Sequence, residues 1–108
     1  MTARELIPGC LGLLERALRC ARDRDPPIRR TCRIQAALYL DELRTLTRTW
    51  DSRAESSVWW THVELLGKSF QHDQWAGVWA QLAQLYRLVG LEEQAWDLLG
   101  LCQREILN

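Results

Sequence analysis

The side chains of this 108-residue chain that could carry out chemistry are two histidines, fourteen acidic residues and four cysteines. His62 and His72 stand ten residues apart, and neither has a second metal ligand three or four positions away. Asp41 and Glu42 are adjacent, and adjacent carboxylates on a helix point to different sides, so they do not form an acid–base pair. Glycine-rich phosphate loops and the HExxH and GxSxG patterns are absent. The sequence predicts no catalytic residue and no enzyme.

The cysteines show no CxxC spacing and no rhythm typical of metal ligands. Cys10, Cys32 and Cys102 fall on or beside apolar helical faces, where a thiol behaves as a small hydrophobic group. We expect Cys20 and these three to be reduced, with no metal and no cofactor. The chain shows no secretory signal and no apolar run of the roughly 20 residues that cross a bilayer. It is therefore expected inside the cell, in the cytoplasm or nucleus, without a membrane partner.

Arginines cluster in the first half of the chain. Residues 1–50 hold ten arginines against six acids, a balance of +4, whereas residues 51–108 hold four basic residues against eight acids, a balance of −4. Arginine binds carboxylates and phosphates in two-pronged contacts. The cluster is a candidate nucleic-acid site, or a solvated and partly self-paired surface, and its members are Arg16, Arg19, Arg22, Arg24, Arg29, Arg30 and Arg33.

Six tryptophans are many for a chain of this length. Trp60 and Trp96 fall about 100° away from the main apolar faces of their predicted helices. An exposed tryptophan is a common anchor of protein interfaces, although these two could also cover the flanks of their own bundle. We predict Trp60 and Trp96 as anchors for a partner, with Arg30 and Arg33 as orienting charges.

Helical periodicity runs through nearly the whole chain, and strand signals are almost absent. Five helices are predicted, at about 7–22, 27–50, 52–71, 74–89 and 91–106. Pro8 suits a first helical turn, Ser52 with Glu55 forms a capping box, Asp73 is a cap, and Gly90 is a left-handed helix end. The expected buried face of the first helix consists of Leu11, Leu14, Leu18 and Ala21, and that of the fifth consists of Ala95, Leu99, Cys102 and Ile106. The main apolar stripe of the second helix consists of Cys32, Ala36, Tyr39, Leu43, Leu46 and Trp50. Its second apolar flank consists of Ile34, Leu38 and Leu40. The apolar stripe of the third helix consists of Trp59, Val63, Leu66 and Phe70.

The segment 76–105 resembles a single tetratricopeptide-type helical hairpin. The resemblance rests on the following residues: Trp79, Leu82, Ala83, Tyr86, Gly90 and Ala95. It departs from the family where Glu92 and Leu99 stand in place of aromatic residues and Cys102 in place of alanine. An ordinary antiparallel helix pair packed on small residues is the alternative.

The resemblance implies a protein-binding unit with a concave surface formed by the first helix of the hairpin. The positions that carry over are Gly77, Ala80, Gln84 and Arg87, and of these Gln84 and Arg87 are the candidate binding residues. Together, these patterns predict one all-α domain over residues 1–108, with about five antiparallel helices in a short solenoid or a compact bundle. We expect a protein–protein interaction module that binds another protein or a second copy, with no small-molecule substrate. Nucleic-acid binding by the Arg16–Arg33 cluster is the alternative.

Overall fold

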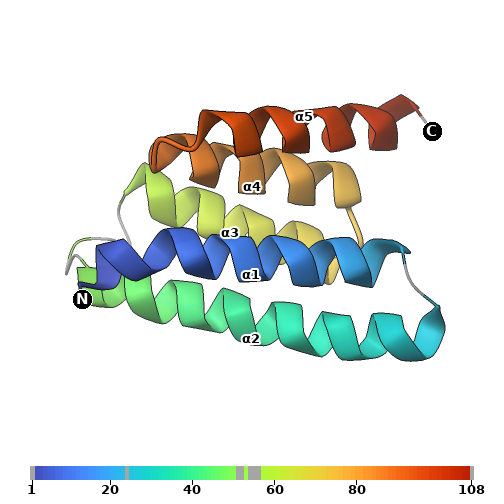
Figure 1. Cartoon of the computed structure of the whole chain (residues 1–108), viewed down its shortest axis with the longest axis horizontal. Helices are drawn as coiled ribbons and strands as arrows, with labels where there is room; N and C mark the ends of the chain where they lie inside the picture. Colours follow the sequence, from blue (N-terminus) through green and yellow to red (C-terminus); the bar gives the residue numbers. More distant parts are fainter. Residues whose placement is uncertain (1, 24, 51–52, 54–56, 108) are drawn as a thin grey trace. The chain divides into compact units, whose positions relative to one another are not determined.

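A computed structural model describes residues 2–23, 25–50, 53 and 57–107. The regular elements of this part of the chain are all α-helices, which confirms the predicted all-α class. Figure 1 shows the helices, which are α1 (Ala3–Asp23), α2 (Pro26–Trp50), α3 (Val58–Gln71), α4 (Trp75–Leu88) and α5 (Glu92–Leu107).

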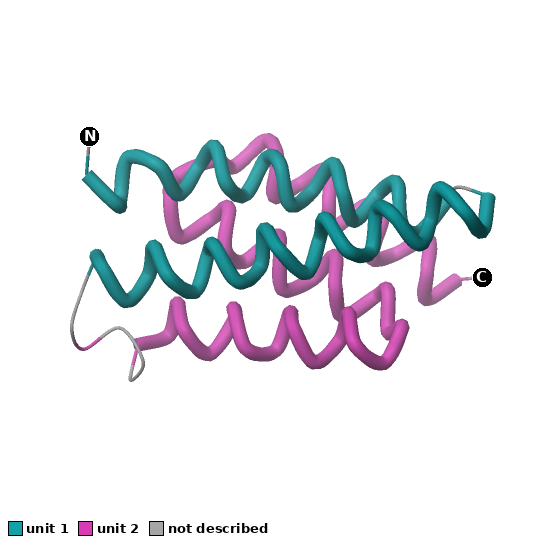
Figure 2. Tube along the Cα trace, turned by 90° about the horizontal axis from the view of Figure 1, so that it is seen from below, with its two compact units in different colours: residues 1–52 teal, residues 53–108 magenta. Residues whose placement is uncertain are grey.

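The chain divides into two compact units, residues 1–52 and residues 53–108, which are coloured separately in Figure 2. In the first unit, α1 and α2 pack against each other as a long antiparallel hairpin. In the second unit, α4 packs against both α3 and α5. Each unit therefore has its own helix–helix packing.

The helix α1 begins four residues before the expected start, and Pro8 lies inside it rather than in its first turn. The hydroxyl of Thr2 accepts a hydrogen bond from the backbone N–H of Glu5 at 3.3 Å, which caps a turn upstream of the proline. Pro8 then removes only one backbone donor from a helix that has already started. The predicted start at Ile7 was wrong because this threonine cap was overlooked.

The helix α1 carries a stripe of buried apolar side chains. The predicted stripe of α1 is confirmed, because Leu11, Leu14, Leu18 and Ala21 are all buried, and Ile7, Cys10 and Ala17 are buried as well. On α2, Leu40 is also buried, although the periodicity had placed it off the main stripe. Trp50 was expected on that stripe but is 38% exposed, and Arg4 lies over its ring at 5.7 Å. This cation–π contact joins the start of α1 to the end of α2.

A disulfide between Cys20 and Cys32 joins the other end of the same hairpin. The Cα atoms of the two residues are 5.8 Å apart, within the usual range for a disulfide. The prediction of four reduced thiols was therefore wrong for these two residues. It relied on sequence spacing, whereas the hairpin brings together two cysteines that are twelve positions apart. Cys10 and Cys102 are free thiols, as expected.

The helices of the second unit begin and end at residues other than those predicted. The expected capping box falls on Ser52 and Glu55, which lie outside the described residues. The described α3 starts at Val58, and the side chain of Ser57 accepts from the backbone N–H of Trp60 at 3.1 Å. The N-cap residue of α4 is Gln74 rather than the predicted Asp73. Asp73 adopts a left-handed conformation with φ 54° in the turn after α3, which aspartate tolerates better than most residues.

The predicted left-handed end at Gly90 is confirmed by its φ of 82°. The backbone N–H of Leu91 donates to the carbonyl of Tyr86 at 2.9 Å, and that of Gly90 donates to the carbonyl of Arg87 at 3.0 Å. This pair of bonds is the Schellman motif, which reverses the chain between α4 and α5.

The buried face of α5 is rotated from the one predicted. Ala95 is buried as expected, but the other fully buried residue is Leu98, whereas Ile106 is 70% exposed. The prediction of this face was wrong because α5 packs against α4 through only a narrow stripe. The helical period of the sequence fits two neighbouring apolar faces equally well, so it could not select between them. Leu99 and Cys102 are half-buried.

Aromatic rings and a close helix approach hold α3 to α4. Phe70 and Trp75 meet edge to face with ring centroids 6.2 Å apart, and Trp75 and Trp79 follow at 5.5 Å. Gly77 lies so near α3 that a Cβ atom there would stand 2.6 Å from the hydroxyl oxygen of Ser69. The predicted stripe of α3 is buried throughout, and its members are Trp59, Val63, Leu66 and Phe70.

Candidate functional site

The two histidines lie in different environments of the second unit. His62 lies half-buried on α3, and its Nδ1–H donates to the side-chain oxygen of Gln81 on α4 at 2.5 Å. His72 is exposed at the end of α3. No group of three or more His, Cys, Asp or Glu side chains that could hold a metal ion occurs in the described part of the chain. His62 therefore serves as a link between two helices.

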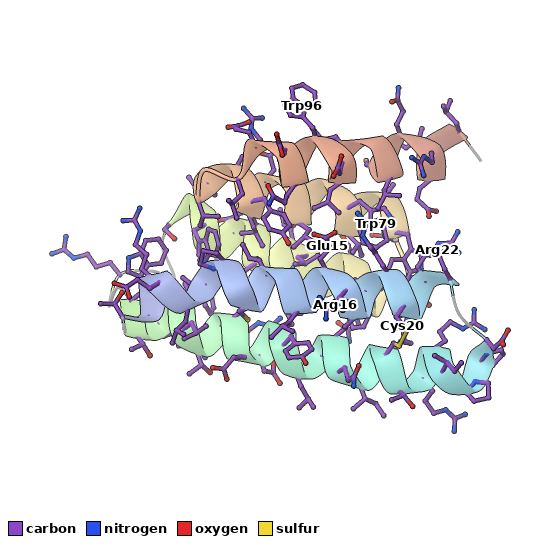
Figure 3. All side chains as sticks on the ribbon, in the orientation of Figure 1. Glu15, Arg16, Cys20, Arg22, Trp79 and Trp96 are labelled. Atoms are coloured by element: carbon purple, nitrogen blue, oxygen red, sulfur yellow. A yellow bond between two sulfur atoms is a disulfide. The ribbon has the colours of Figure 1, made fainter. Side chains whose placement is uncertain are left out.

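Trp96 is the most exposed tryptophan side chain of the described chain, at 70%, and Figure 3 shows it pointing outward from α5. The same helical face carries Gly100, Gln103 and the exposed Leu107, at spacings of four, three and four. A Cβ atom at Gly100 would meet nothing within 4 Å. We call this stripe the outer α5 face. It presents an aromatic and an aliphatic side chain to solvent, with a small residue between them.

The other predicted partner residues are spread over several environments. Trp60 is half-buried on α3 and is not free. Gln84 is half-buried on α4, and Arg87 is exposed with its Nε 3.9 Å from a carboxylate oxygen of Glu92. Gly77 is covered by α3, so this part of the surface implied by the repeat resemblance is not open to a partner.

The described arginines of the predicted cluster lie on the parts of α1 and α2 nearest the turn of their hairpin, and Arg24 lies outside the described residues. Arg16 and Arg19 line one hollow of about 520 Å³ together with Asp23. Arg19 is ion-paired with Glu15 at 2.8 Å, and Arg33 is half-buried and not free. Arg30 is exposed on the first turn of α2. Because Arg30 and Arg33 belong to the first unit and Trp60 and Trp96 to the second, the predicted anchors and charges lie on different units.

A groove that the sequence analysis missed runs along the line where α1 and α2 meet. It consists of two adjoining hollows, of about 480 and 230 Å³, which share Leu13 and Tyr39. The larger hollow is completed by Leu6, Gly9, Cys10, Glu42 and Leu46, and the smaller one by Arg16, Ala17, Cys20, Cys32 and Gln35. We call these two hollows the α1–α2 groove. Figure 3 shows Arg16 and Cys20 along this line.

The thiol of Cys10 lies at the floor of the groove. Its Sγ donates to the backbone carbonyl of Tyr39 at 3.5 Å, which connects α1 to α2. Burial, with the negative charge of Glu42 as a second cause, raises the pKa of Cys10 from 9.0 to about 11. Cys10 therefore stays protonated at neutral pH and is a poor nucleophile.

One sequence signal could have revealed the groove. Residues 6, 10, 13 and 17 on α1 and residues 35, 39, 42 and 46 on α2 recur at spacings of four, three and four. Helices with this spacing pack side by side. The apolar residues on two flanks of the second helix were one half of this signal, and the matching line on the first helix was the other half.

Comparisons of the chain with protein-family models, with curated proteins and with solved structures gave no match. None of the described helices combines the length and the apolarity needed to cross a lipid bilayer. The outer α5 face, the arginines and the α1–α2 groove are therefore the features of this chain that indicate a function.

Proposed function

We propose that this chain is a protein–protein interaction module, an adaptor or small subunit of a larger assembly, with no catalytic activity of its own. The observation that carries the proposal is the 70% exposure of Trp96 on the outer α5 face. Tryptophan exposes a large apolar area to water, and binding a partner removes that area from water. Tryptophan is also enriched among the residues that dominate binding energies at protein interfaces.

The resemblance to a tetratricopeptide-type hairpin supports the same class of function. The helices α4 and α5 form a hairpin over the segment that carries the resemblance, and Gly90 ends the first helix at the expected position. Hairpins of that family bind proteins through surfaces built from stacked helices. On this chain, Arg87 and Gln84 are the remaining candidates on the first helix of the hairpin.

The test is affinity purification of the chain from cells, followed by mass spectrometry, with Trp96→Ala beside the native sequence. An anchor tryptophan should cost about 2 kcal/mol or more of association when truncated. Leu88→Ala is a matched control, because Leu88 is also an exposed apolar residue in the second unit. Partners that are lost with Trp96→Ala, but kept with Leu88→Ala, support the proposal. Identical partners for both variants would refute this site.

The second candidate is nucleic-acid binding by the arginine cluster. Arg16 favours it, because this exposed side chain has no ion pair or hydrogen bond among the described residues. Phosphate contacts lose affinity steeply with salt, with a log–log slope of about 0.9 per contact, whereas an apolar protein interface is much less sensitive. A titration with labelled RNA and DNA at two salt concentrations separates the two functions.

The cellular location remains part of the proposal, and we place the chain in the cytoplasm or nucleus. The Cys20–Cys32 disulfide bears on this point, because such bonds persist mainly in oxidising compartments. Intact mass of the chain from cells lysed in a thiol-blocking reagent will show whether the pair is oxidised where the protein resides.

A further inference from the structure

The first unit carries a second packing line beside its buried face. On α1 this line consists of Leu6, Cys10, Leu13 and Ala17, and on α2 of Gln35, Tyr39, Glu42 and Leu46. Two helical hairpins with such a spacing of three and four residues pack face to face as a four-helix bundle. The spacing is thus suited to a second hairpin of the same kind.

The middle of this line is apolar and open. Leu13 and Tyr39 line both hollows of the α1–α2 groove, and Leu13 remains 44% exposed. Leu6, at the open end of the larger hollow, is 43% exposed. Gly9 lines the same hollow and would have nothing within 4 Å of an added Cβ atom. A partner could therefore approach the α1 backbone closely at this point.

Opposite charges flank the middle of the groove. Arg16 follows Leu13 by three residues on α1, and Glu42 follows Tyr39 by three residues on α2. Because the two helices are antiparallel, these steps lead in opposite directions along the groove. Both side chains are exposed, and neither has an ion pair or a hydrogen bond within the described part of the chain. The groove is therefore positive on one side of its centre and negative on the other.

A second copy of this chain fits that arrangement. The two copies are related by a twofold axis that runs perpendicular to the helices and passes near Leu13 and Tyr39. The two hairpins then face each other with their helices running in opposite directions. The Arg16 end of each groove then lies over the Glu42 end of the other. Such an interface is self-complementary, as symmetric dimers require. No unknown partner has to be assumed, because both charges and the apolar side chains of the groove are present in one chain.

We propose that the chain forms a symmetric homodimer through the α1–α2 groove, with Arg16 of each copy facing the partner's Glu42. The inference rests on the proposed function in that self-association is one form of protein binding. It concerns a different surface from the outer α5 face, so the two can be tested apart. In the dimer, Leu13 and Tyr39 become buried and the two opposite charges are paired across the interface.

The experiment is sedimentation of the oxidised full chain over a range of concentrations, with far-UV circular dichroism of every variant. The native chain should show a reversible dimer. Leu13→Lys should weaken it about a hundredfold, a loss of roughly 2.7 kcal/mol. Leu88→Lys is the matched control, because Leu88 is 49% exposed and lies outside the groove. It should leave the dimer unchanged.

Charge exchange gives the sharper test. Arg16→Glu and Glu42→Arg each place like charges opposite one another and should each weaken the dimer about tenfold. The double variant Arg16→Glu/Glu42→Arg should regain most of that affinity, which a general effect on folding would not produce. A chain that stays monomeric up to about 1 mM overturns the proposal. So does a dimer that is insensitive to Leu13→Lys, or a double variant as weak as the two single ones.

The outer α5 face provides the comparison with the proposed function. Trp96→Ala should dimerise as the native chain does and lose its cellular partners. A dimer that is lost with Trp96→Ala, but kept with Leu13→Lys, would reject the groove and retain the α5 face as the binding surface. A dimer that depends on the groove, together with unchanged cellular partners for Trp96→Ala, would support the groove and reject the outer α5 face as the binding surface.

Discussion

The two units of the chain are stabilised by different kinds of contact. The first unit has two long helices, of 21 and 25 residues, which are joined at one end by the Cys20–Cys32 disulfide and at the other by the Arg4–Trp50 contact. The second unit has three shorter helices of 14 to 16 residues, connected by the turns at Asp73 and Gly90. In addition to the packing between its helices, the first unit is linked at both ends, whereas the second unit has contacts between aromatic rings in its interior.

This difference has a physical cause. A two-helix layer has two broad faces, and a helix pair by itself leaves side chains on both of them exposed. A helix packed between two others, as α4 is between α3 and α5, covers most of its circumference, and Val78, Trp79, Leu82, Ala83, Leu85 and Tyr86 are all buried on it. The first unit therefore retains an apolar groove. The second unit exposes apolar residues on each of its helices, and the most exposed of them, Trp96, Ile106 and Leu107, lie on α5.

The largest expected effect comes from the interior of the second unit. Trp79→Ala should lower the free energy of unfolding by about 3–5 kcal/mol, because Trp79 is 2% exposed and stacks on Trp75. Urea unfolding monitored by circular dichroism measures the change. Trp96→Ala is the control, and its effect should stay within about 0.5 kcal/mol because its ring is exposed. Equal losses for both variants would contradict an aromatic interior centred on Trp79.

The next effect tests the end-linked first unit. Reduction of the Cys20–Cys32 disulfide should destabilise the chain by about 3 kcal/mol, because the bond closes a short loop in the unfolded state. Unfolding in the presence and absence of a reductant gives the difference. Cys20→Ser should show the reduced stability under both conditions. An intact mass that shows four free thiols in the native chain without a reductant would contradict the Cys20–Cys32 disulfide and this difference between the two units.

A smaller effect probes the close contacts of the α4–α5 hairpin. Ala83 is fully buried on α4, so Ala83→Leu should overpack its surroundings and cost about 1–3 kcal/mol. The melting temperature should fall accordingly. Ala37→Leu is the matched control, because Ala37 is exposed on α2 of the first unit. An unchanged melting temperature for Ala83→Leu would mean that this hairpin is not tightly packed.

The smallest effect concerns the Cys10 thiol in the groove. Its pKa of about 11 lies above the ordinary 9.0, so the folded chain keeps the proton longer than the unfolded chain does. Stability from this group is complete below pH 9 and is lost as the pH rises towards 11. Alkylation of Cys10 by iodoacetamide, followed by mass spectrometry, should be slow at neutral pH. Glu42→Gln should lower the pKa only in part, because burial is the larger cause. A rate that rises already at pH 8 would contradict a buried thiol.

The helices and most of their buried faces could be predicted from the sequence, because amphipathic periodicity is a local property of the chain. The stripe through Leu14 and Leu18 is buried as predicted, and Gly90 adopts the left-handed turn that its position required. The face of α5 could not be fixed in the same way, since Leu98 and Leu99 are neighbours and only packing against α4 selects between them.

The features that involve two helices were the ones that the sequence did not reveal. The Cys20–Cys32 disulfide depends on the register in which α1 and α2 pack against each other in the hairpin. The bond between His62 and Gln81 joins residues nineteen positions apart, and neither neighbourhood contains a motif. The exposure of Trp96, in contrast, was implied by its angle on the helix, although its role in binding remains a prediction.

The glycines of the helices predict how this sequence should vary among relatives. Gly77 admits no Cβ atom without displacing Ser69, whereas Gly12 and Gly100 have open space around them. Substitutions should therefore accumulate freely at position 12 and be fewer at position 77. Gly9 also has room within a single chain, so it should vary as freely as Gly12 if the chain acts as a monomer. Retention of glycine at position 9 across diverged sequences would instead record a constraint imposed by a second molecule.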